Sequence, residues 1–126
     1  MITALVAAFL VVHGLLHPGV WAAPVQPGRQ APFEPGHSWV LSAAHVSAAP
    51  TRAAALALAW YTALAYCVAG AGTAAGADWW ATAALVGAAS GLVLKAIWYD
   101  PWLTVGVLLD VAVLVAVANS WPPSLY

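Results

Sequence analysis

The sequence has very few charged residues, and this scarcity excludes most classes of soluble protein. Only 6% of its 126 residues are Asp, Glu, Lys or Arg, whereas 64% are hydrophobic. Soluble domains usually carry about 25% charged residues. With three Lys and Arg against four Asp and Glu, the chain has no basic field for phosphate groups, so nucleic acid is not expected as a partner. We expect the lipid bilayer to surround it.

Cysteine is also scarce. Cys67 is the only one and lies in an apolar segment, so intrachain disulfides and all-cysteine metal sites are excluded. The sequence has no nucleophile paired with a base, no phosphate-binding loop and no multi-histidine hydroxylase pattern. We therefore predict no catalytic residues, and an enzyme is the less favoured class.

Long apolar segments are abundant. Four of them approach the roughly 20 residues needed to cross a hydrocarbon core of about 30 Å. The last two begin and end at tryptophans, spaced as two interfacial belts require. The predicted fold is an all-α integral membrane four-helix bundle, a single transmembrane domain over residues 1–126. Its spans cover residues 2–20, 52–72, 79–99 and 102–120.

The link between the first two spans, residues 23–50, has a different composition. "APVQPGRQAPFEPG" contains four prolines and two glycines, so it cannot continue a helix. "HSWVLSAAHVSAA" then predicts a short helix that ends near Pro50 and lies at the membrane surface or over the bundle. Between the last two spans, Asp100 and Pro101 have the pattern of a helix N-cap followed by proline at N1.

The orientation follows from three cations. Arg29, Arg52 and Lys95 fall on the side of the first and third loops, so the positive-inside rule predicts cytoplasmic loops there and both termini outside. "VWAAP" after the first apolar run leaves a cleaved signal peptide as an alternative. No Lys or Arg precedes that run, which favours a retained span.

Small residues recur at every fourth position on three of the spans, which allows close helix packing. These surfaces either pack helices within one chain or join copies into a homo-oligomer. They comprise Ala83, Gly87 and Gly91 on the third span, Ala55, Ala59 and Ala63 on the second, and Ala112 and Ala116 on the fourth.

The few polar side chains near the spans gather towards one side of the membrane, which predicts a polar cluster that could bind a ligand. An ionisable group at mid-span costs roughly 2.5 to 3.5 kcal/mol, so Asp110 must be protonated, paired or facing water. Lys95 differs from it in depth by only about 5 Å. Lys95 therefore either pairs with Asp110 or extends to the headgroups. The predicted cluster is His13, His17, His37, His45, Lys95 and Asp110.

Three interpretations of the histidines remain open. His13 and His17 lie one turn apart and could bind one zinc or copper ion, completed by His45 or His37 with Asp110. They could instead form ordinary interhelical hydrogen bonds, or belong to a proton or ion relay. Haem is less favoured, because the last three spans contain no histidine to bind it from the opposite side.

Three motifs point to a group of relatives. "HGLLH" near the amino terminus, "WW" before the third span and "WYDPWLTVGVLLD" into the fourth together resemble a group of small, uncharacterised four-span inner-membrane proteins of high-GC bacteria. The similarity covers most of the chain and implies a multi-pass protein of the plasma (inner) membrane, but no activity. The sequence departs from that pattern at "HPG" after His17, where we expect the first helix to break, and in its proline-rich loop.

Three functions are compatible with these features. The first is binding of a metal ion or small ligand at the polar cluster. The second is a non-catalytic accessory subunit that docks through its small-residue faces against a larger membrane complex. The third is an oligomeric ion or proton carrier that uses Asp110 and Lys95.

Overall fold

Four long helices make up most of the protein. The computed structural model describes residues 1–24, 27–28 and 33–126, and these contain helices but no strands. Each of the four spans is long and apolar enough to cross a membrane, which confirms the all-α bundle. The elements are α1 (Ile2–Trp21), the short α2 (Trp39–Ala43), α3 (Ala48–Ala75), α4 (Trp80–Ile97), the 3-10 turn η1 (Pro101–Leu103) that leads into α5 (Thr104–Ala118), and a final turn η2 (Pro123–Leu125).

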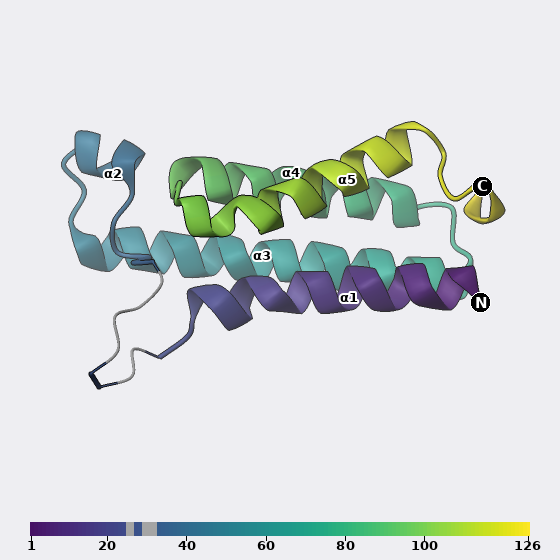
Figure 1. Ribbon diagram of the computed structural model, residues 1–126, viewed down its shortest axis with the longest axis horizontal. Helices are drawn as coiled ribbons and strands as arrows, with labels where there is room; N and C mark the ends of the chain where they lie inside the picture. The colour runs from purple at the N-terminus through teal and green to yellow at the C-terminus, as the bar shows by residue number, and fades with distance from the viewer. Residues whose placement is uncertain (25–26, 29–32) are drawn as a thin grey trace.

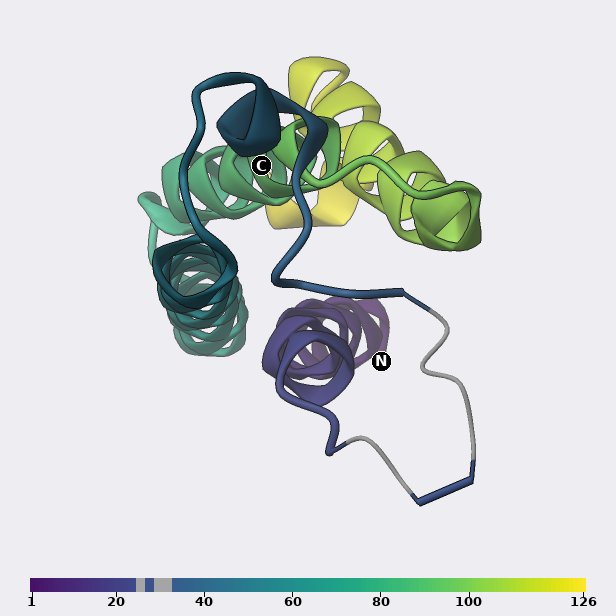
Figure 2. The same ribbon diagram turned by 90° about the vertical axis from the view of Figure 1, so that its left-hand side faces the viewer.

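The long helices run alternately up and down and pack in the order of the sequence. α1 packs on α3, α3 on α4, and α4 on α5. Figure 1 shows both termini at one end of the bundle, with the first loop and α2 at the other. In the end-on view of Figure 2, α1 and α3 form one layer and α4 and α5 the other. α1 and α5, the first and last helices, are not among the closely packed pairs.

Small residues bring α3 against its neighbours, so this packing lies within one chain. Ala55, Ala59 and Ala63 on α3 are at most 2% exposed. On α4, Gly87 and Gly91 are buried as predicted, whereas Ala83 is only partly buried. On α5, Ala112 is exposed and Ala116 only partly buried, so the predicted small-residue face of this helix does not pack within one chain, and its alternative role between copies stays a prediction. The buried residues of α5 are Asp110 and Val113, so a different face of this helix packs inward.

Two prolines lie inside helices where the sequence predicted breaks. α1 continues through Pro18 to Trp21. Because Pro18 has no N–H, one carbonyl near the end of the helix lacks its intrahelical partner. The last turn still forms, and the Ala22 N–H donates to the Pro18 carbonyl at 2.8 Å. Pro50 lies in the first turn of α3, where helical N–H groups have no partner in any case. α3 therefore begins four residues before the predicted span, and the predicted loop helix shrinks to α2.

The first loop is fastened to the C-terminal end of α4. Helix ends leave carbonyl oxygens without intrahelical partners, and loop side chains donate to two of these while Trp98 donates back to the loop. α2 is thereby held at the end of the bundle. The bonds run from Ser38 Oγ to the Ile97 carbonyl (2.6 Å), from Trp39 Nε1 to the Ala96 carbonyl (2.8 Å) and from Trp98 Nε1 to the Pro35 carbonyl (2.9 Å).

The turn between α4 and α5 has the predicted cap. Asp100 Oδ1 accepts the Trp102 N–H at 2.8 Å, and Pro101 follows at the first position of η1.

The three cations from which the sequence predicted an orientation differ in their surroundings. Arg52 pairs with Glu34 on the surface, Lys95 is buried, and Arg29 lies outside the described residues. The orientation stays a prediction.

Candidate functional site

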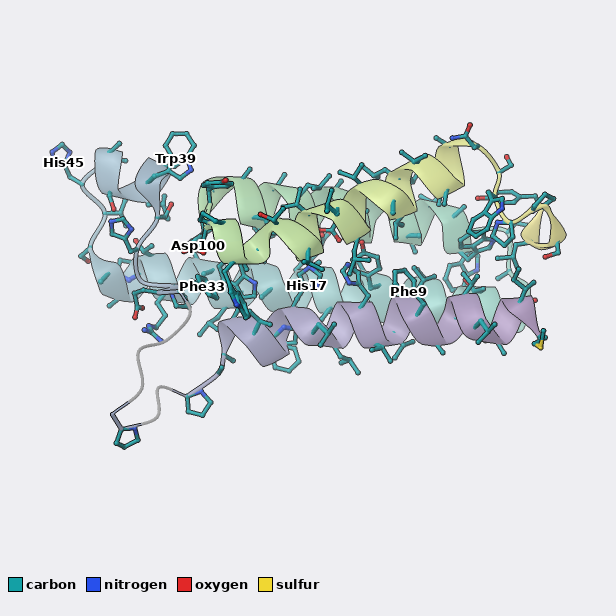
Figure 3. The ribbon with its side chains drawn as sticks, in the orientation of Figure 1. Phe9, His17, Phe33, Trp39, His45 and Asp100 are labelled. Carbon is teal, nitrogen blue, oxygen red and sulfur yellow. The ribbon has the colours of Figure 1, made fainter. Side chains whose placement is uncertain are left out.

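Five polar side chains meet inside the bundle and form what we call the polar cluster. α1 contributes His13 and His17, α3 contributes Tyr66, α4 contributes Lys95 and α5 contributes Asp110. Each is at most 4% exposed. All four long helices therefore supply at least one member. Figure 3 shows His17 on the α1 side that faces the other helices, near the middle of the molecule.

Asp110 is the acceptor at the centre of the cluster. Its Oδ1 accepts the Tyr66 hydroxyl at 2.7 Å and lies 2.8 Å from His13 Nε2. Its Oδ2 lies 2.7 Å from the Lys95 ammonium. The predicted Lys95–Asp110 ion pair is thus confirmed, and it removes the cost of leaving either charge alone in an apolar surrounding.

Lys95 links the carboxylate to the second histidine. Its Nζ lies 2.8 Å from His17 Nε2 and donates to the Gly91 carbonyl at 3.3 Å, in addition to its bond with Asp110. The other His17 nitrogen, Nδ1, lies 3.1 Å from the His13 carbonyl. The lysine therefore points into the bundle, and the alternative in which it reaches the headgroups is wrong.

Glycines on the helices make room for these side chains. A Cβ on Gly91 would lie 2.5 Å from Asp110 Oδ2, and one on Gly106 would lie 2.6 Å from Lys95 Cε. A Cβ on Gly14 would lie 2.6 Å from Tyr66 Cβ. Such distances are well inside van der Waals contact, so a Cβ at any of these positions would force the neighbouring cluster side chain to shift.

Two predicted members lie outside the cluster. His37 and His45 are exposed in the first loop, and Figure 3 shows His45 beyond α2 at the end of the molecule, far from His17. The fastening of the loop to the end of α4 explains this, because it keeps α2 away from the buried groups. The predicted metal shell with His45 is therefore not formed.

Tyr66 is a cluster member that the sequence analysis missed. It lies on the same α3 face as the buried alanines Ala59 and Ala63. A tyrosine in the middle of an apolar span needs a partner for its hydroxyl, and its place on a small-residue face points that hydroxyl inward. This combination was the signal that could have identified it.

The cluster lies beside a crevice between α1 and α5. Three hollows, of about 350, 380 and 440 Å³, follow one another along this edge and share lining residues. His13, His17 and Lys95 line the hollow nearest the first loop. The remaining walls are almost entirely apolar. We call the joined hollows the α1–α5 crevice; its other lining residues include Leu5, Phe9, Leu16, Val105 and Leu109.

The histidines and Asp110 also have the donor atoms of a metal site. One donor atom from each of His13, His17 and Asp110 lies within 4.8 Å of the others. The Lys95 ammonium, however, lies within hydrogen-bond distance of both His17 Nε2 and Asp110 Oδ2. It thus holds the position from which a metal ion would reach these two donors, and an ion would have to displace it.

The side chains of the site indicate which chemistry it can support. The cluster combines an ion pair, two imidazoles and a phenol beside an apolar crevice. Such an arrangement can bind the polar group of a lipid-soluble molecule, or it can pass protons between its own side chains. No protein-family model matches the chain, and comparisons with curated proteins and with solved structures gave no match either.

Proposed function

We propose that this multi-pass membrane protein binds a lipid-soluble small molecule in the α1–α5 crevice and recognises its polar group through the polar cluster. One observation carries the proposal: His13, His17 and Lys95 line a crevice whose other walls are almost all apolar. Small-molecule sites in proteins have this composition, a mainly apolar pocket with a few convergent polar groups.

The position of the crevice supports a ligand that arrives through the bilayer. α1 and α5 are not closely packed, so the edge between them is open along the spans. Residues on its two sides, such as Leu16 on α1 and Val105 on α5, are more than half exposed. A molecule dissolved in the hydrocarbon core can therefore enter sideways, without passing through water.

The test is to identify what the protein retains on purification. The protein is extracted in mild detergent, and its organic extract is compared with bulk membrane lipid by mass spectrometry. We expect one lipid-soluble compound enriched to about one per chain. Leu109→Trp fills the crevice and should remove that compound.

Leu108→Trp is the matched control, because Leu108 is 62% exposed on the same helix and does not line the three hollows. It should retain the compound at the wild-type level. Wild-type protein without an enriched compound, or equal enrichment in Leu109→Trp, would contradict crevice binding.

A further inference from the structure

We infer that the molecule in the α1–α5 crevice is uncharged and long-chained, and that its head is a hydroxyl group that donates a hydrogen bond to Nδ1 of His13. This inference rests on the proposed function and adds the chemical class of the ligand. It follows from where the protons of the cluster lie, from its charge and from the walls of the crevice.

The protons can be assigned starting from Lys95. A charged lysine has three N–H donors and no acceptor, and its three partners are Asp110 Oδ2, His17 Nε2 and the Gly91 carbonyl. Nε2 of His17 must then accept. The proton of a neutral His17 lies on Nδ1, which donates it to the His13 carbonyl. Both nitrogens of His17 and all donors of Lys95 are therefore used.

His13 differs, because one of its nitrogens has no partner. Its Nε2 donates to Asp110 Oδ1, which also accepts the Tyr66 hydroxyl. Its Nδ1 is buried and forms no hydrogen bond with any described residue. In a neutral imidazole whose Nε2 carries the proton, Nδ1 is an acceptor. A buried polar atom without a partner is costly, and a ligand hydroxyl would satisfy this one.

The charge of the cluster favours an uncharged ligand. With both imidazoles neutral, the Lys95 and Asp110 charges cancel across their 2.7 Å contact. An anion or a cation in the crevice would add a charge without a counter-charge in a medium where one costs several kcal/mol. A metal ion would also have to displace the ammonium from its two acceptors.

The walls of the crevice require a long apolar chain on that hydroxyl. His13 lines two of the three hollows, and the third continues towards the chain termini between aliphatic and aromatic side chains. If the head group of the ligand lies at His13, its apolar chain would extend along the α1–α5 crevice and replace membrane lipid there. Long-chain or isoprenoid alcohols and lipophilic phenols share this chemistry.

One half-exposed aromatic side chain lies beside the His13 ring in the crevice. Phe9 stacks on the His13 ring, with centroids 5.6 Å apart, and is 41% exposed on the lipid side. Exposed side chains change rotamer within nanoseconds. Phe9→Ala should widen the crevice beside this ring and strengthen binding of a hydroxyl-headed ligand, whereas a ligand held only by apolar contact would lose affinity.

The test uses a set of twelve-carbon probes that carry a diazirine in the chain and differ only in the head group. The heads are a hydroxyl, a phenol, a carboxylate, a trimethylammonium and a plain methyl. Protein in phosphatidylcholine nanodiscs is irradiated with each probe, and labelled residues are identified by mass spectrometry. The hydroxyl or phenol probe should label crevice residues most strongly, and the stronger of the two identifies the source of the hydroxyl.

Three variants separate the outcomes. Leu109→Trp should abolish the labelling, Leu108→Trp should leave it unchanged, and His13→Ala should lower it roughly three- to tenfold, the loss expected for one hydrogen bond. Equal labelling by the charged or methyl probes, or no loss in His13→Ala, would overturn the ligand class while crevice binding stands. If Leu109→Trp does not reduce labelling by any of the probes, both the ligand class and crevice binding are wrong.

A second readout uses the wild-type protein and avoids any loss of folding in His13→Ala. In protein labelled with ¹⁵N-histidine, Nδ1 of His13 should give the resonance of an unprotonated ring nitrogen. Addition of dodecanol should shift that resonance and leave His45, exposed in the first loop, unchanged. A protonated Nδ1, or a resonance that dodecanol does not move, would contradict the inference.

Discussion

Among the described residues, Asp110 connects the most helices through side-chain hydrogen bonds. Its two oxygens accept from side chains on α1, α3 and α4, so one carboxylate connects α5 to all three of the other long helices. Its negative charge also balances Lys95 in the apolar interior. Removing either partner leaves the other charge buried without compensation, which costs more than the pair contributes.

Asp110→Asn should therefore destabilise the protein by about 3 to 5 kcal/mol, measured as the free energy of unfolding in mixed detergent micelles. The double variant Asp110→Asn with Lys95→Met has no buried charge and should recover part of this loss. If the double variant is no more stable than Asp110→Asn alone, the charge balance described here is not what holds the cluster together.

Lys95→Met should turn the cluster into a zinc site. Without the ammonium, a zinc ion can reach His13, His17 and Asp110, whose donor atoms already lie within 4.8 Å of one another. Elemental analysis after incubation with zinc should give about one ion per chain for the variant and far less for the wild type. Arg52→Met removes an exposed cation and should match the wild type; equal zinc in wild type and Lys95→Met would contradict the role given to Lys95.

The sequence predicted much of the cluster, for reasons of depth. Helical rise alone put Lys95 and Asp110 at similar levels, and the spacing of His13 and His17 put both on one face of α1. The sequence did not predict that His45 lies outside the polar cluster. Its position depends on three hydrogen bonds between the first loop and the end of α4. Tyr66 was not among the predicted members, and the partner of its hydroxyl lies on another helix, 44 positions away in the sequence.

At the scale of the helices, packing depends on glycines that let side chains of the next helix approach. Gly14→Ala and Gly91→Ala each place a Cβ about 2.5 to 2.6 Å from Tyr66 or Asp110, and each should destabilise the protein by about 1 to 3 kcal/mol. Gly19→Ala on α1 meets nothing within 4 Å and should be neutral or slightly stabilising. Unfolding in the same micelles compares the three, and equal stability of all three would show that these close approaches are not needed.

Helix positions could be predicted from the sequence more securely than helix ends or faces. Apolar length and the tryptophan belts gave the four spans. The ends were missed at Pro18 and Pro50, because a proline in the first or last turn removes few hydrogen bonds. On α5 the sequence predicted Asp110 as a member of the polar cluster, and it is buried. The spacing of Ala112 and Ala116 did not decide whether they pack within one chain or between copies.

At the scale of the whole molecule, the two ends of the bundle should be accessible from opposite sides of the membrane. His45 and Ser124 are both exposed and are separated by α3, α4 and α5. In a Cys67→Ala background, Ser124→Cys should react with an impermeant maleimide added to intact cells, and His45→Cys only after permeabilisation. The reverse pattern would invert the orientation, and labelling of both from one side would contradict the four spans.

The open edge between α1 and α5 could not be predicted from the sequence. Each of these helices is apolar on most faces, so its pattern does not specify which neighbour it takes. The edge results from packing in chain order, with α3 and α4 in the middle. Only the three-dimensional arrangement brings the histidines of the first helix within reach of the carboxylate on the last.

The position of Asp110 on the last helix also constrains how the protein is made. The ribosome completes α1, α3 and α4 first, so His13, Tyr66 and Lys95 are synthesised before their shared acceptor exists. Lys95 precedes Asp110 by 15 positions, and the two face each other across the hairpin that α4 and α5 form. The lysine and the aspartate therefore enter the membrane most favourably together, as one neutralised hairpin that docks onto helices already in place.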